Sequence, residues 1–381
     1  MVSWTEPQLP LPESAGFAKI RVCGVGGGGV NVVRRMATLN IPGVELLCIN
    51  TDAGSLSTVH NIPCLGIGAQ LTRGMGSGGN PEIGKRAALE SRADLRRFLE
   101  GADLVFIAAG MGGGTGTGAA PVIAEMAREI GAISIAVVTT PFAFEGVRRR
   151  SVAEAGLKPL RDSADTVIVV SNNRLLSTAS KKASVVESFS RADKVMQDAI
   201  AAVSRIINVA GDINIDFADV RTVVTRGGAG VMSIGVGEGT QRVMKAAQAA
   251  FENPLLECSI QGAKGMVFTV TGGPDVTLNE LNEAGMFISS MTDPDAEIFF
   301  GMHIDAARKP AMPVEMVIVA TRLPQNPRDG EPDPAKSTAA DKVQRAAARY
   351  YAEDDIPAFL KTVEFNFDDP GKNKPPDGAG R

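Results

Sequence analysis

Between residues 18 and 172 the sequence alternates short apolar runs with segments of helical pattern. The apolar runs include "IRVCGV", "VELLCIN", "ADLVFIAAG", "AISIAVVTT" and "DTVIVVSN". Continuous apolar strands separated by helices are typical of a mostly parallel sheet that is covered on both faces. The alternation therefore predicts an α/β fold whose N-terminal part, residues 18–175, is a doubly wound, Rossmann-like domain.

The rest of the chain divides into further segments by composition. A helical stretch at 176–208 predicts a long central connecting helix, and strands interleaved with helices at 209–323 predict a smaller α/β domain. Residues 324–353 are rich in Pro, Asp and charge, which predicts a disordered linker. We expect a short flexible tail at 1–17, and a docking peptide with a tail at 354–381.

Composition excludes several classes of function. A formal net charge of -4 over 381 residues leaves no basic footprint for nucleic acid. The N-terminal stretch does not resemble a secretory signal, and every apolar run is shorter than the ~18 residues of a membrane span. We therefore expect a cytoplasmic protein without direct membrane insertion. The two histidines and four cysteines have no metal-ligand spacing, so no metal site is expected from them.

Glycine-rich loops follow the predicted strands at 22–33 and 108–121, and a third lies at 72–84. The first-turn N–H groups of a helix lack partners, and the helix dipole favours negative charge there. Glycine lets a phosphate approach such a backbone closely. Three loops of this kind indicate a polyphosphate ligand.

The first loop also fits a dinucleotide-binding fingerprint, Gly24-x-Gly26-x-x-Gly29, with Asp52 ending the next strand. An NAD-dependent oxidoreductase is therefore an alternative, although it explains neither of the other two loops. A P-loop NTPase is disfavoured because the main loops contain no Gly-x-x-x-x-Gly-Lys-Ser/Thr run.

The run "GGGTGTG" resembles the signature of the tubulin/FtsZ superfamily, and its flanks resemble bacterial FtsZ. Further similar segments, in the family's order, include "NTDA" at 50–53, "TTPFAFEG" at 139–146, "NIDFADV" at 214–220 and "DPDAEIFFG" at 293–301. The resemblance covers residues 18 to 323. It implies a GTPase that binds GTP or GDP and assembles head to tail into the filaments of the bacterial division (Z) ring at mid-cell. A divergent filament protein with weak or no GTPase activity is the alternative.

The resemblance also implies roles for individual residues. The nucleotide phosphates would lie against Gly26, Gly27, Gly28, Asn31, Gly112, Gly113, Gly114, Thr115, Gly116 and Thr117, with the γ-phosphate near Ser77 and Gly78. Ribose and phosphate contacts would come from Glu145 and Arg149. Asn172 and Phe189 would hold the guanine, Phe189 by stacking.

The loop "GDINIDFADV" carries two carboxylates, Asp216 and Asp219, that follow Asn214 closely. Two neighbouring carboxylates can orient a water and accept its proton during phosphoryl transfer. The spacing alone is more typical of a capped helix start with solvated acids, and it does not fit a twelve-residue calcium loop. The resemblance implies that these three residues are catalytic and act on the nucleotide of the next subunit, with Mg²⁺ bridging the β- and γ-phosphates.

Two further features concern recognition. Lys194 stands where the family usually has an acidic residue that accepts from the guanine edge, and a lysine cannot accept a hydrogen bond. The guanine contact at Lys194 is therefore lost unless the adjacent Asp193 replaces it. Near the C-terminus, "DDIPAFLK" resembles the peptide with which the family binds membrane-tethering and regulatory division proteins, through Ile356, Pro357, Phe359 and Leu360.

Overall fold

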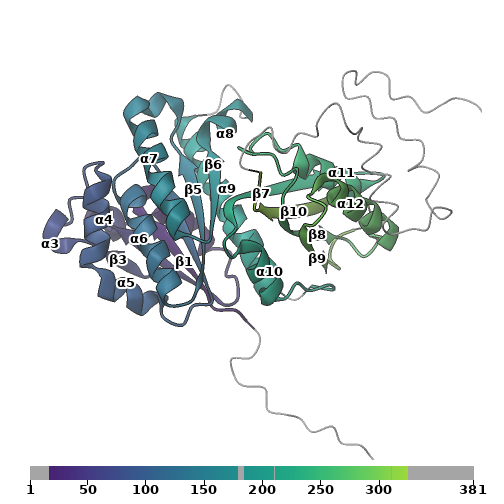
Figure 1. The fold of residues 1–381 in the computed structure, drawn as a ribbon, viewed down its shortest axis with the longest axis horizontal. Coiled ribbons are helices and arrows are strands. Elements are labelled where there is room, and N and C mark those ends of the chain that lie inside the picture. Colours follow the sequence, from purple (N-terminus) through teal and green to yellow (C-terminus); the bar gives the residue numbers. More distant parts are fainter. Residues whose placement is uncertain (1–16, 179–183, 210, 310, 325–381) are drawn as a thin grey trace, which may run out of the picture.

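A computed structural model describes residues 17–178, 184–209, 211–309 and 311–324. In this part of the chain the strands form one ten-stranded sheet in the order β3-β2-β1-β4-β5-β6-β7-β10-β8-β9 (Figure 1). The strands are β1 (Ile20–Val25), β2 (Val44–Asn50), β3 (Cys64–Gly66), β4 (Leu104–Gly110), β5 (Ile133–Thr140), β6 (Thr166–Ser171), β7 (Gly228–Gly237), β8 (Gly265–Gly272), β9 (Glu297–Ile304) and β10 (Val314–Thr321).

The helices of the N-terminal half cover both faces of the parallel strands. They are α1 (Gly26–Met36), α2 (Ala53–Ser57), α3 (Ala69–Thr72), α4 (Pro81–Glu90), α5 (Arg92–Leu99), α6 (Thr115–Glu129), the short 3₁₀ helix η1 (Ala143–Glu145), α7 (Val147–Ser163) and α8 (Asn172–Thr178). The second half contributes α9 (Val185–Asn208), α10 (Phe217–Val224), α11 (Arg242–Phe251) and α12 (Leu278–Met291).

Strands β1 to β6 pair in parallel, as the continuous apolar runs predict. Alternate residues of one strand enter two different cores. In β4, Val105 and Ile107 pack with α6, whereas Leu104 and Phe106 pack toward α1 and α9. Both faces are therefore buried, which is why apolar residues run through these strands with few interruptions.

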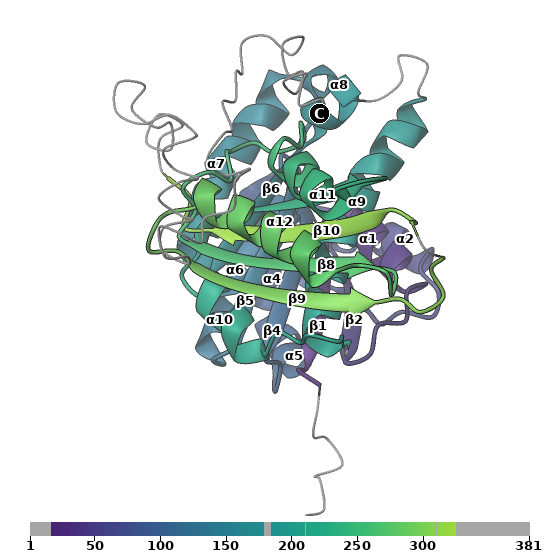
Figure 2. The ribbon, with the colours of Figure 1, turned by 90° about the vertical axis from the view of Figure 1, so that its right-hand side faces the viewer.

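The smaller C-terminal α/β unit continues the same sheet through β7, and its strands β10, β8 and β9 lie side by side in Figure 2. The first residues of β7 pair in parallel with β6, and the later ones pair antiparallel with β10. Helices α11 and α12 pack on one face of this unit, and α10 packs on the other. One strand thus joins the two halves of the molecule.

Helix boundaries follow local capping chemistry. Asn80 accepts a hydrogen bond from Glu82 N (3.0 Å), and Pro81 occupies the first turn of α4, as predicted. The long central helix begins at Val185 rather than at 176, because Ser184 and Glu187 form a capping box there. The predicted start of the connector belongs to the separate helix α8.

Candidate functional site: a three-loop phosphate cradle

The glycine-rich loops meet at the carboxyl ends of β1 and β4. Helix α1 starts directly after β1, and α6 starts at Thr115; at both starts no side chain caps the helix. The free amides of the two first turns are therefore left for a ligand. A methyl group added at Gly26, whose φ is +70°, would lie 3.1 Å from Gly116 N, so the two loops are in contact.

The third loop joins the other two through hydroxyl groups at Thr115. Its Oγ1 lies 2.7 Å from Oγ1 of Thr51, at the end of β2, and 3.1 Å from Oγ of Ser77 in the third loop. Ser77, Thr51 and Thr115 are all buried. Thr51 is not among the predicted site residues, although it lies within the "NTDA" motif.

Open space remains where a phosphate would approach. A methyl group built at Gly27, Gly78 or Gly113 would meet no atom within 4 Å, and Gly27 and Gly78 are exposed. By contrast, a methyl group at Gly114 would collide with Ser77, and one at Gly116 would lie 2.6 Å from Gly110 O. Some glycines thus hold the loops together, while others line an open cradle. Asn31 lies exposed on α1, and Gly28, Gly112 and Thr117 complete the set of predicted phosphate residues in the two loops.

A cluster of aromatic rings follows β5 beside the cradle. The ring centroid of Phe189, near the start of α9, lies 5.0 Å from that of Phe142 and 6.3 Å from that of Phe144. Phe189 is 39% exposed, so one part of the ring is free to stack. Asn172, the first residue of α8, is buried, and its Oδ1 has no hydrogen-bond partner. A buried acceptor without a partner suits a donor group of a bound ligand.

The remaining predicted ligand residues pair with one another or with their own helix. Glu145 accepts from Phe142 N (2.9 Å) and forms an ion pair with Arg149 at 2.6 Å. Lys194 is exposed and pairs with Asp198, one turn later on α9. Asp193 instead packs against Arg35 of α1 at 3.8 Å, and its burial raises its pKa to about 6. This ion pair joins the last turn of α1 to the first half of α9.

The predicted catalytic residues lie elsewhere. Asp216 is the N-cap residue of α10 and is exposed, and Asp219 lies in the first turn of the same helix. Asn214 Oδ1 accepts from Gly211 N (2.6 Å), and Ile213 forms an isolated bridge with Met302 of β9. These contacts hold the 211–219 loop against the C-terminal unit.

Helix α9 separates this loop from the cradle. Its start contacts Phe142 after the carboxyl end of β5, whereas Asn208 at its end donates to Ala18 O and Pro42 O, which precede β1 and β2. A helix of 24 residues is about 36 Å long. Figure 1 accordingly draws α10 and α8 at opposite ends of the parallel strands. Within one chain, the structure does not bring Asn214, Asp216 and Asp219 to the glycine loops.

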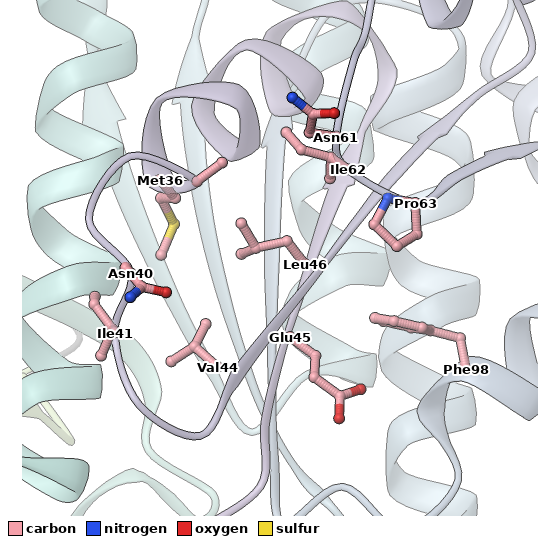
Figure 3. Close-up of a pocket in the computed structure, with 11 residues that line it drawn as sticks. Met36, Asn40, Ile41, Val44, Glu45, Leu46, Asn61, Ile62, Pro63 and Phe98 are labelled. Carbon is pink, nitrogen blue, oxygen red and sulfur yellow. The ribbon is translucent and has the colours of Figure 1, made fainter.

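A cavity of about 410 Å³ lies at the other end of β2 from the cradle (Figure 3). Its lining is about equally polar and apolar and comes from the end of α1, the first half of β2 and the segment before β3: Met36, Ala37, Asn40, Ile41, Val44, Glu45, Leu46, Asn61, Ile62 and Pro63, with Phe98. The cavity therefore is not part of the glycine-loop site.

Comparison with known proteins identifies the architecture. Residues 19–180 match the model of the Tubulin/FtsZ family GTPase domain, and residues 228–323 match that of the FtsZ family C-terminal domain. The chain is 45% identical to the cell division protein FtsZ of Pseudomonas aeruginosa over 307 residues, 80% of this chain and 77% of that protein. The chain belongs to the FtsZ family.

Solved structures agree with FtsZ-family membership. An empty FtsZ dimer of M. jannaschii superposes with a TM-score of 0.74 at 40% identity, covering 80% of this chain and 88% of the other. The GTPγS-bound protofilament of CetZ2 from Haloferax volcanii shares the fold, with a TM-score of 0.71 at 19% identity, over 87% of this chain and 98% of the other. The predicted fold class is confirmed.

Family membership also decides between the readings of the first glycine loop. The loop belongs to a GTPase domain of the FtsZ family, so the NAD-dependent oxidoreductase alternative is not favoured. Among the described residues no helix is long and apolar enough to cross a membrane, and His, Cys, Asp and Glu do not gather into a possible metal site. Cys23 and Cys48 are free and buried, as expected for core cysteines. The predicted docking residues, Ile356 to Leu360, lie outside the described residues.

Proposed function

We propose that this chain is an assembly-activated GTPase of a bacterial division ring. It binds GTP in the three-loop cradle of one subunit and hydrolyses it where the 211–219 loop of the next subunit approaches. The supporting observation is the separation of the two halves of the site by the whole length of α9. Because one chain cannot bring them together, head-to-tail contact supplies the missing half.

The phosphates are held mainly by the amides of the first turns of α1 and α6, with the hydroxyls of Ser77 and Thr115 beside them. Backbone amides at two helix starts stabilise negative charge without reorganising during the reaction. Mg²⁺ fits this site as an ion carried by the phosphates, because the described residues offer hydroxyls there but no acidic cluster. When bound, it neutralises charge on the β- and γ-phosphates.

The incoming loop contributes the acid–base part. Asp216 is exposed, and no side-chain bond to α10 occupies its carboxylate. Asp219 lies one turn further on the same helix, so the two carboxylates reach one attacking water together. Asn214 is the third residue proposed to orient that water.

The C-terminal peptide is proposed to connect the filament to the membrane indirectly. Ile356, Pro357, Phe359 and Leu360 form a short apolar group between charged residues, which suits docking on an apolar groove of a tethering or regulatory division protein. Such a tether places the cytoplasmic filament at the mid-cell ring.

Mixing two inactive variants tests the proposal. Asp216→Ala should bind GTP but not hydrolyse it, and Gly27→Ala should lose GTP while keeping its carboxylates. Combined, they should recover turnover, because Gly27→Ala subunits complete the sites of GTP-loaded Asp216→Ala subunits. Wild-type turnover per molecule should also rise with protein concentration.

The matched control is Asp94→Ala, which removes an exposed first-turn carboxylate of α5 and should leave turnover unchanged. Turnover per molecule that stays constant down to high dilution would contradict completion between subunits. Loss of GTP binding in Asp216→Ala would show that this aspartate lies in the cradle of its own chain.

A further inference from the structure

Two cysteines face each other across the outer edge of the sheet. In the parallel pair β2–β3, Cys48 is the register partner of Cys64, and Cys48 N donates to Pro63 O at 2.9 Å. Neighbouring strands lie about 4.8 Å apart, and register partners project to the same face. This spacing is within the range of about 4.4–6.8 Å between Cα atoms that a disulfide requires.

The two thiols differ in access. Cys64 is exposed and donates weakly to Ile62 O at 3.4 Å, whereas Cys48 is fully buried. Burial, and then the charge and hydrogen bonding of the adjacent Cys64 thiol, raises the pKa of Cys48 to about 12. Ile62 and Pro63, immediately before Cys64, line the open cavity of Figure 3. An oxidant from solvent therefore meets Cys64 first.

We propose that Cys48 and Cys64 are a modification site at which a hydroperoxide forms a reversible disulfide. The Cys64 thiolate attacks the peroxide, which is reduced to an alcohol or water and leaves Cys64 as a sulfenic acid. Cys48 sulfur then attacks the Cys64 sulfur, its proton joins the departing hydroxide, and water is released. In total the two thiols lose two electrons to the hydroperoxide and become one disulfide. An added dithiol reduces this disulfide back to two thiols.

The disulfide would act on the segment that carries the third loop. After β3, Ile67 N donates to Asn50 O (3.0 Å), and Gly76 N donates to Thr51 O (3.1 Å). The end of β2 is thus already hydrogen-bonded to the third loop just before Ser77. A disulfide between Cys48 and Cys64 would add a covalent link between β2 and β3. Resting on the proposed function, we infer that oxidation slows GTP turnover by restricting this loop.

The test treats the full-length reduced protein with hydrogen peroxide under native conditions, blocks the remaining thiols and maps the peptides by mass spectrometry. We expect a linked peptide pair containing Cys48 and Cys64, loss of two of the four free thiols, and their recovery with dithiothreitol. Cys258→Ser, which removes the other exposed cysteine, should give the same linked pair.

Cys64→Ser should abolish the crosslink, and Cys48→Ala should leave Cys64 as a sulfenic or more oxidised form. Finding Cys64 in the wild-type chain only as a sulfinic acid, or joined to Cys258 or to another chain, would overturn the proposed pair. Turnover is compared between reduced and oxidised protein, with Cys64→Ser insensitive to peroxide. A crosslink without any change in turnover would refute the effect on the third loop, and a reduced protein without GTPase activity would instead refute the proposed function.

Discussion

The phosphate side and the base side of the candidate site are built from different materials. Around the phosphates, the groups are main-chain amides at glycines and two buried hydroxyls, Ser77 and Thr115. On the proposed base side they are side chains, Phe189 and Asn172, with Lys194 and Asp193 on the next turn of α9. The phosphate side depends on loop shape, whereas the base side depends on individual residues.

This difference predicts which positions tolerate substitution. In the cradle, a methyl group at Gly114 or Gly116 would meet atoms of a neighbouring loop, so substitution there disturbs several elements together. On α9, Lys194 is exposed and pairs only with its own helix among the contacts described. A side chain on an exposed helix surface can change without repacking, so the fold tolerates substitution on the base side more readily than in the cradle.

The largest expected effect is at Gly27, where the main-chain cradle is open. Gly27→Ala places a methyl group in space that is empty of protein atoms and blocks the phosphate from the first-turn amides. Loss of two charge-assisted hydrogen bonds weakens the affinity for GTP by roughly a hundredfold or more. Isothermal titration with GTP measures this loss of affinity, while the midpoint of thermal unfolding should be unchanged or slightly raised.

Gly285→Ala on α12 is the matched control, because a methyl group there also meets nothing within 4 Å. It should leave GTP affinity unchanged and stabilise the fold by about 0.5–1 kcal/mol. Normal GTP binding by Gly27→Ala would mean that the phosphates do not approach the start of α1, and the contrast between the two sides would fail.

Asp193 gives the next effect, since it is a buried carboxylate on the base side. Its pKa of about 6 lies above the usual 3.8, so the folded state favours the protonated form. The contribution of protonated Asp193 to stability is fully present below pH 4. It is lost as the pH rises through 6. Above pH 6 the ionised group costs about 3 kcal/mol. Asp193→Asn should therefore be more stable at pH 8, with the gain shrinking toward pH 5 in urea unfolding.

Asp198→Asn on the same helix is the comparison, because it removes only an exposed ion pair with Lys194 and should change stability by a few tenths of a kcal/mol. If Asp193→Asn were less stable than wild type at pH 8, attraction to Arg35 would outweigh the burial of the carboxylate.

The main-chain side of the site is also the side that can be predicted from sequence. Strand, glycine run and helix start are neighbours in the chain, so "VCGVGGGG" and "AAGMGGGTGTG" contain the geometry locally. Asn80-Pro81 marks the start of α4 in the same way. The parallel arrangement of these strands also follows from their nearly continuous apolar character.

Tertiary contacts could not be predicted in this way. The Arg35–Asp193 pair and the Thr51–Thr115 hydroxyl contact join residues far apart in the chain, and no local pattern announces them. The break before α9 had a local signal, "SVVE" at 184–187, which is a capping box. Helix-forming residues on both sides of this motif predict one continuous helix, so the motif alone does not reveal the break. The pairing of β7 with both β6 and β10 likewise depends on the assembled sheet.

Phe189 should give a smaller effect than the cradle. Stacking of a base on an aromatic ring contributes about 1–3 kcal/mol, so Phe189→Ala should weaken the affinity for GTP by roughly ten- to a hundredfold. The affinity for ATP should fall equally, because every base has a stacking face. Phe189→Tyr keeps the ring and should bind normally in fluorescence titration with labelled nucleotides. Unchanged GTP affinity in Phe189→Ala would remove stacking from the base side.

The smallest effect is expected at Lys194, and it decides whether the base side has lost its guanine contact. Lys194→Asp replaces a side chain that only donates with one that accepts, which should raise the preference for GTP over ATP by about tenfold. Its new charge lies one turn from Asp198 and should lower stability by less than about 0.5 kcal/mol. Competition binding with GTP and ATP measures the preference. Lys194→Met removes the positive charge without adding an acceptor. An equal gain in the preference for GTP in this variant would mean that removing the cation suffices. An unchanged preference in both variants would place the side chain of residue 194 away from the base.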